Sequence, residues 1–162
     1  MAQTTNVMRL LTAAGLPFSA HSYDPSTTDG MLVAAALGEN PEQVFKTLVT
    51  EADGGVGNGG HGSVHFVFVV PVNCSLDLKK AAKAAGVKSI QMIKQKELLP
   101  LTGYIHGGCS PVGMKKPFKT FIEESATLYE NIFVSAGQVG HQIGINPLDL
   151  KEYVGADFAD LV

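Results

Sequence analysis

The segment VFKTLVT, residues 44–50, decides the fold of this chain together with VHFVFVV, residues 64–70. Both are rich in β-branched and aromatic residues, which favour strands, and both are shorter than a typical helix. We therefore expect strands at residues 45–50 and 64–70. The intervening residues 53–63 include six glycines and are predicted to be the connection of a hairpin.

Caps and stop signals place helices on both sides of these strands. Asp29 and Gly38 are expected to bound a helix, and Asn146 followed by Pro147 is typical of a helix start. The helices expected in this way span residues 7–14, 31–37, 76–85 (with Ser75 as cap), 94–99 and 148–154. Further strands are expected at residues 18–23, 87–92, 118–123, 131–135 and 142–145.

Strands and helices do not alternate strictly in this order, which favours a mixed α+β sheet over a doubly wound one. We see no internal repeat or linker in the 162 residues, so one domain is expected over residues 1–162. Hydrophobic residues make up 45% and charged residues 17%, which indicates a folded globular chain rather than a disordered one.

The composition also narrows the classes of function. The two cysteines, Cys74 and Cys109, lie far apart, as expected for reduced thiols in a cytoplasmic protein. No signal peptide is expected, and the longest apolar run, residues 64–72, is far below the roughly 20 residues of a membrane span. With a net charge of −3, the overall composition does not indicate nucleic-acid binding, so any RNA contact is expected to be local. Two lysine clusters could provide it or could simply be solvated: Lys79, Lys80, Lys83 and Lys115, Lys116, Lys119.

Lys46 is the most informative single residue, because it lies inside a strand that is expected to be largely buried. An ammonium group there is costly unless it reaches water, a counter-charge or a ligand. Its stem can lie along the sheet with the head in water. Alternatively, Lys46 points into a cleft and binds a phosphate or carboxylate as a point charge. The residues by themselves leave both interpretations open.

The turn Gly107-Gly108-Cys109-Ser110-Pro111 is the second candidate. Two adjacent glycines let the backbone approach a ligand closely, and successive amides in such a turn can polarise a carbonyl or hold an oxyanion. A tight turn without function is the ordinary alternative.

Nucleophilic and metal chemistry are weakly indicated. Cys109 with His106 three residues earlier could form a cysteine-dependent hydrolase, but a third orienting group is missing. His61 and His65 have a spacing that needs a helix to bind metal, whereas they lie at the junction of a glycine-rich segment and a strand. We expect no metal ion and no cofactor.

Six segments follow one another along the chain in a characteristic order: residues 45–49 (FKTLV), 70–71 (VP), 76–82 (LDLKKAA), 102–104 (TGY), 107–113 (GGCSPVG) and 134–137 (VSAG). Taken together, they resemble the YbaK/EbsC family of aminoacyl-tRNA deacylases, which are relatives of the editing domain inserted in bacterial prolyl-tRNA synthetase. The resemblance covers nearly the whole chain, and it implies one YbaK-like editing domain built on a convoluted, partly barrel-like and mostly antiparallel sheet flanked by helices.

The resemblance further implies hydrolysis in trans of the ester of mischarged aminoacyl-tRNA, most simply Cys-tRNA(Pro), in the cytoplasm. Ala-tRNA(Pro) is the alternative substrate, and a non-catalytic tRNA- or nucleotide-binding module is the alternative function. The expected partners are the acceptor end of aminoacyl-tRNA and, in a transient complex, prolyl-tRNA synthetase.

Site residues follow from matched positions only. Lys46 matches the lysine expected to bind the tRNA 3′ end, and Gly107 to Pro111 match a GxxxP loop whose amides hold the aminoacyl carbonyl. The resemblance thus implies catalytic roles for Lys46, Gly107, Gly108 and Ser110, and substrate-binding roles for Tyr23, Thr47, Cys109, Pro111 and Gly137.

The chain departs from the family pattern at two positions. Thr28-Asp29-Gly30 stand where relatives have a pocket phenylalanine before the glycine, and Gln142 stands where some relatives have an aspartate. Both departures bear on amino-acid specificity rather than on the reaction. No side-chain nucleophile is implied, because the substrate's own thiol or a ribose hydroxyl assists the hydrolysis, so Cys109 is expected to have no nucleophilic role.

Overall fold

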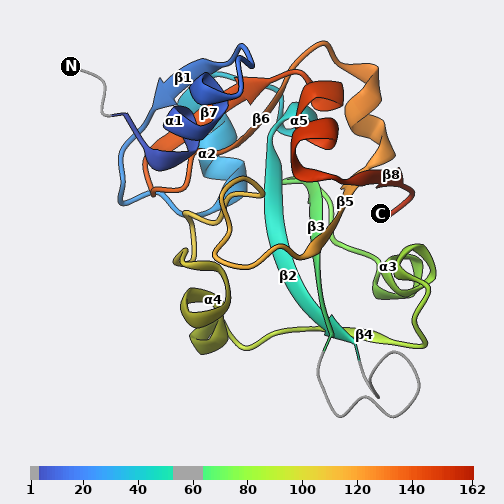
Figure 1. Ribbon diagram of the computed structural model, residues 1–162. Coiled ribbons are helices and arrows are strands. Elements are labelled where there is room, and N and C mark those ends of the chain that lie inside the picture. The colour runs from blue at the N-terminus through green and yellow to red at the C-terminus, as the bar shows by residue number, and fades with distance from the viewer. Residues whose placement is uncertain (1–3, 53–63) are drawn as a thin grey trace.

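The computed structural model describes residues 4–52 and 64–162, which form two sheets and the helices around them (Figure 1). The smaller sheet is antiparallel and has the order β1-β7-β6, with β1 at Ser19–Ser22, β6 at Ile132–Ser135 and β7 at His141–Ile145. The larger sheet has the order β4-β2-β3-β5-β8. Its strands are β2 (Phe45–Ala52), β3 (Val64–Pro71), β4 (Ile90–Met92), β5 (Lys119–Glu123) and β8 (Asp157–Ala159).

Among the described strands most pairs are antiparallel, and only the β3–β5 and β5–β8 pairs are parallel. An isolated bridge between Val44 and Phe133 connects the two sheets just before β2 begins. The mixed α+β architecture is therefore confirmed. Its described strands form two joined sheets and do not close into a barrel.

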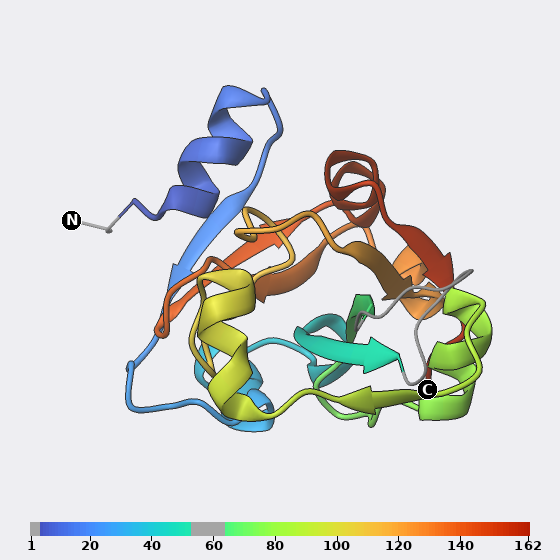
Figure 2. The same cartoon turned by 60° about the horizontal axis from the view of Figure 1, so that its bottom comes forward.

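Five α-helices surround the sheets: α1 (Asn6–Ala13), α2 (Gly30–Leu37), α3 (Leu78–Ala85), α4 (Gln95–Thr102) and α5 (Pro147–Val154). Short 3₁₀ turns lie at Pro41–Gln43 and Glu124–Leu128. The predicted caps of α2 and α5 are confirmed, since the Asp29 and Asn146 side chains accept hydrogen bonds from first-turn amides. Both views place α2 and α4 on the side of β2 opposite α3 (Figures 1 and 2).

Two predicted helix boundaries were wrong. Helix α3 begins at Leu78 with Asp77 as its cap, because the Asp77 carboxylate accepts from the amides of Lys79 and Lys80; Ser75 lies outside the helix. Helix α4 continues through Pro100 to Thr102 and ends at Gly103, which has a φ of +82°. Strand β8 was not predicted, and residues 53–63 of the expected hairpin connection lie outside the described residues.

Strand β3 is buried on both faces, which explains its uninterrupted apolar sequence. Val67 and Val69 pack into the core shared by both sheets, α1 and α5, whereas Phe66 and Phe68 pack toward α3. The larger sheet is thus held on both sides, and β2 is rigidly placed beside β3. None of the helices in the described ranges has the length and apolar character needed to cross a bilayer.

Candidate active site

A pocket of about 280 Å³ lies along the open edge of β2. Strand β4 pairs with residues 50–52 of β2 only, so residues 45–48 have no described strand beyond them on that side. All four of these residues line the pocket, whose size is near the lower end of the roughly 300–1,000 Å³ usual for small-molecule sites. The bridge at Val44 holds the smaller sheet against this edge.

The other walls come from segments that are distant in sequence. Tyr23 follows β1, Gln142 lies on β7, and Gly107 and Cys109 belong to the loop after α4. The complete lining comprises Tyr23, Thr28, Asp29, Gly30, Val33, Val44, Phe45, Lys46, Thr47, Leu48, Val72, Leu98, His106, Gly107, Cys109, Ser135 and Gln142. Five of the nine predicted site residues are therefore brought together here: Tyr23, Lys46, Thr47, Gly107 and Cys109.

Lys46 brings an uncompensated positive charge to the pocket. Its side chain is partly buried, and no carboxylate among the described residues lies within 4.0 Å of its ammonium nitrogen. By contrast, Lys80 pairs with Asp160 at 3.1 Å and Lys119 pairs with Asp157 at 2.6 Å. A cation without a protein partner at a pocket wall is suited to bind an anionic ligand group.

The loop 107–111 fits tightly between two other segments. Gly107 has a φ of +88°, and an added Cβ there would lie 3.0 Å from Thr28 Cγ2. A Cβ on Gly108 would lie 3.1 Å from the backbone nitrogen of Val139. Both positions therefore need glycine, the first for its dihedral angle and the second for the close backbone approach.

The backbone amides of this loop differ in whether they already have a hydrogen-bond acceptor within the protein. Gly108 N–H donates to the carbonyl of Ile105 at 3.0 Å, so this amide already has an acceptor within the protein. The amides of Gly107, Cys109 and Ser110 have no acceptor within the part of the chain that the structure describes. Of these three residues, Gly107 and Cys109 line the pocket.

Ser110, Pro111 and Gly137 are not among the described residues that line this pocket. Ser110 is fully buried, and its hydroxyl accepts a hydrogen bond from Val112 N–H at 3.2 Å. Pro111 is buried as well, and Gly137 has a φ of +92° with Tyr104 and Val7 directly against it. The roles expected for these three residues stay predictions.

Three buried polar atoms in the pocket have no partner among the described residues: Tyr23 Oη, Thr47 Oγ1 and Gln142 Oε1. Buried polar groups are nearly always hydrogen-bonded, so three orphans that line one cavity indicate a polar ligand. Gln142 was noted in the sequence only as a departure from a family pattern. An isolated glutamine in a strand carries no local signal of such a position.

Cys109 is poorly suited to act as a nucleophile. Burial raises the pKa of its thiol to about 12, so the thiolate is scarce at neutral pH. His106 is exposed, and no hydrogen bond connects it to Cys109 within the described residues.

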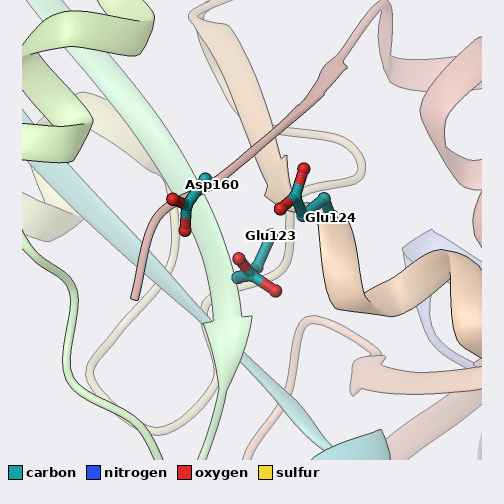
Figure 3. Close-up of side chains that lie close together, drawn as sticks. All are labelled: Glu123, Glu124 and Asp160. Atoms are coloured by element: carbon teal, nitrogen blue, oxygen red, sulfur yellow. The ribbon is translucent and has the colours of Figure 1, made fainter.

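The histidines and carboxylates considered as metal ligands are also poorly suited to this role. His61 lies outside the described residues, and His65 packs on the Phe118 ring with its Nε2 4.0 Å from Glu51. Glu123, Glu124 and Asp160 bring their carboxylates together (Figure 3). However, Glu123 already accepts from the amides of Ser125 and Leu161, and Asp160 pairs with Lys80.

Comparison with known proteins shows which family this chain resembles. The family model named "Aminoacyl-tRNA editing domain" matches residues 25–153 of this chain. The chain is 42% identical over 161 residues to the protein named "Putative Cys-tRNA(Pro)/Cys-tRNA(Cys) deacylase EbsC" of Enterococcus faecalis, covering 98% of this chain and 93% of that protein. It is 27% identical over 115 residues to the proline–tRNA ligase of Shouchella clausii, covering 70% of this chain and 19% of the ligase.

Solved structures agree on the fold. One solved structure, described as "Crystal structure of a putative trans-editing enzyme for prolyl tRNA synthetase", superposes on this chain with a TM-score of 0.79. The two are 25% identical, and the match covers 99% of this chain and 98% of the other. Hypothetical protein APE2540 superposes with a TM-score of 0.83 at 22% identity, covering 96% and 97%, and supports the fold alone. From the matched family model and the near full-length relative, we conclude that this chain belongs to the aminoacyl-tRNA editing domain family.

Proposed function

We propose that this protein is a trans-acting deacylase that hydrolyses the ester of mischarged aminoacyl-tRNA, with Cys-tRNA(Pro) as its main substrate. Membership in the editing-domain family supports the reaction, and the name of the relative from Enterococcus faecalis supports the cysteinyl substrate. We further propose that residues 1–162 act as one editing domain, because the similarity to that relative spans 98% of the chain.

The observation that carries the proposal is the shared pocket of Lys46 and the loop 107–111. Lys46 supplies the only lysine or arginine among the pocket-lining residues, and it binds a phosphate of the tRNA 3′ end. The amides of Gly107 and Cys109 are free to polarise the ester carbonyl and to stabilise the oxyanion. Donors of this kind contribute on the order of 3 kcal/mol each to the transition state.

Hydrolysis then needs no protein nucleophile. Water adds to the ester carbonyl, the tetrahedral intermediate collapses, and the terminal ribose hydroxyl of the tRNA leaves with a proton. A neighbouring ribose hydroxyl or the thiol of the esterified cysteine assists this step. Groups held in such proximity reach effective molarities of 10⁵ M or more in favourable cases, enough to replace a side-chain nucleophile.

The partner and location follow from the substrate. We propose a transient complex with prolyl-tRNA synthetase, since misacylated tRNA(Pro) is released there, and we propose action in the cytoplasm. The similarity to part of a proline–tRNA ligase is consistent with a common editing task.

A deacylation panel tests the proposal. Purified protein is mixed with tRNA(Pro) carrying cysteine, alanine, proline or serine, and release of each amino acid is followed. Cysteinyl-tRNA is expected to be hydrolysed fastest. Faster release of alanine would make Ala-tRNA(Pro) the substrate, and tRNA binding without turnover of any ester would indicate a binding module.

Lys46→Ala is the diagnostic variant. Loss of the phosphate contact is expected to lower kcat/KM about 10- to 100-fold, as for a hydrogen bond to a charged group. Lys83→Ala is the matched control, because Lys83 is an exposed lysine on α3, outside the pocket lining. Equal effects of the two variants would contradict the assigned role of Lys46.

A further inference from the structure

Gln142 is the most deeply buried of the polar groups that line the pocket without a partner. It lies on β7 between Ser135 of β6 and His21 of β1, and its exposed fraction is 6%. Its Oε1 receives no hydrogen bond from the described residues. Leaving such a buried acceptor without a donor is unfavourable, so a bound group that donates to it gains affinity.

The polar groups of the pocket divide into donors and acceptors. Lys46 and the amides of Gly107 and Cys109 can only donate, which suits the phosphate and carbonyl oxygens of an aminoacyl ester. Gln142 Oε1 can only accept, and the hydroxyls of Tyr23 and Thr47 can accept as well. Hence the pocket contains an acceptor group that the phosphate and the carbonyl do not use.

Every aminoacyl-tRNA carries a charged donor group next to the ester, namely its α-ammonium, besides the neutral donors of its ribose and base. Asp29 is the only carboxylate in the lining, but it is exposed and its Oδ1 caps α2 by accepting from Met31 and Leu32. Of the three buried atoms without a partner, the amide oxygen of Gln142 is the one that can only accept, whereas the hydroxyls of Tyr23 and Thr47 can also donate.

Resting on the deacylase function above, we propose that Gln142 binds the α-ammonium group of the esterified amino acid, and that the enzyme therefore requires a free α-amino group. An N-acylated amino acid has a neutral nitrogen with a single N–H and an added bulky group. Peptidyl-tRNA and N-formylated aminoacyl-tRNA belong to this class. The site accordingly discriminates against them and restricts editing to free aminoacyl esters.

The test compares cysteinyl-tRNA(Pro) with N-acetyl-cysteinyl-tRNA(Pro) as substrates of the wild-type protein. We expect kcat/KM to be about 10- to 100-fold lower for the acetylated ester, the range of a hydrogen bond to a charged group. Equal values would overturn the proposal while leaving the deacylase function intact. Failure to hydrolyse either ester would instead remove the deacylase function on which the proposal rests.

Variants of Gln142 test whether this residue causes the preference for a free α-amino group. Gln142→Met, which keeps the length but removes the acceptor, is expected to lose most of the preference for the free amine. Gln142→Glu, which offers only acceptors, is expected to keep it. Loss of the preference in Gln142→Glu would mean that the amide donates rather than accepts, against the proposal.

Two further variants serve as references. Gln138→Met makes the same change at an exposed position of the neighbouring turn, outside the pocket lining, and is expected to keep the preference. Asp29→Asn keeps the cap of α2 but removes the carboxylate. If Asp29→Asn abolishes the preference and Gln142→Met does not, Asp29 holds the ammonium and the proposal is wrong. Thermal unfolding of each variant shows whether it is folded.

Discussion

At the scale of single residues, the site combines a glycine, a cysteine and a lysine that each have an unusual environment. Gly107 is constrained by its backbone angle and by Thr28, Cys109 is held in its neutral form, and Lys46 has no counter-charge in the described chain. None of these features resembles an activated nucleophile. All of them are consistent with a protein that positions and polarises its substrate.

Cys109→Ala is expected to retain most of the deacylase activity, within about tenfold of the wild-type kcat/KM. The pKa of about 12 keeps the thiol protonated from pH 6 to 9, so no thiolate ionisation should appear in the pH–rate profile. Kinetics with Cys-tRNA(Pro) over that range provide the measurement, with Cys74→Ala as control. A loss of several hundredfold in the Cys109 variant alone would favour a cysteine nucleophile.

Gly107→Ala is expected to lower both stability and activity. The left-handed backbone angle costs an alanine about 1–2 kcal/mol, and its Cβ would press on Thr28. Gly155→Ala is the matched control, because Gly155 has a φ of +68° but nothing within 4 Å of an added Cβ. Urea unfolding should show destabilisation of both variants, whereas deacylation should fall only in Gly107→Ala. Unchanged activity in that variant would argue against a close fit of the loop to the substrate.

At the scale of elements, short helices and strand edges position the pocket. Strand β2 contributes four successive lining residues because β4 pairs with its second half only. Helix α2 closes one side, and its start is defined by Asp29. The same capping rule applies on the other side of β2, at α3, where Asp77 and not the predicted Ser75 caps the helix.

Asp77→Ala is expected to destabilise the protein by about 1 kcal/mol, since it removes the acceptor of the Lys79 and Lys80 amides. Ser75→Ala should stay within about 0.5 kcal/mol of wild type, as for most surface positions. The free energy of unfolding from urea titrations distinguishes the two. A larger effect at Ser75 would contradict the observed cap.

At the scale of the whole molecule, the proposed function requires a slightly acidic chain to bind an anionic polymer, which favours a few local contacts. The net charge is −3, and Lys80 and Lys119 are already paired with acidic residues. These pairs favour the interpretation of both lysines as charge-balancing surface groups. Binding to tRNA is therefore expected to be weak and confined to the region of the pocket.

The affinity for tRNA should fall with rising salt along a shallow slope. Each phosphate contact on a single strand contributes about −0.7 to the slope of log K against log salt concentration. Lys46→Ala should reduce the magnitude of the slope by somewhat less than 1, and Lys83→Ala should leave it unchanged. Fluorescence anisotropy with the 3′ acceptor end of tRNA measures it. Tight binding that is insensitive to salt would contradict a local contact.

Short-range patterns were sufficient to predict most elements of this fold. Strands β2 and β3, the caps at Asp29 and Asn146 and the mixed architecture all follow from hydrogen bonds and packing within a few residues, which a sequence displays directly. Strand β8 and the division into two sheets escaped prediction, because they depend on which segments pair over long distances.

The candidate site was likewise predictable from the sequence only in part. Residue type and spacing were enough to single out Lys46 and the double glycine, since a cation in a strand and adjacent glycines are unusual in themselves. The hydrogen bonds from the Gly108 amide to Ile105 and from the Val112 amide to Ser110, and the lack of a partner for the Gln142 oxygen, were decided by folding. Which polar atoms are satisfied depends on partners brought together by tertiary contacts, and no local pattern encodes them.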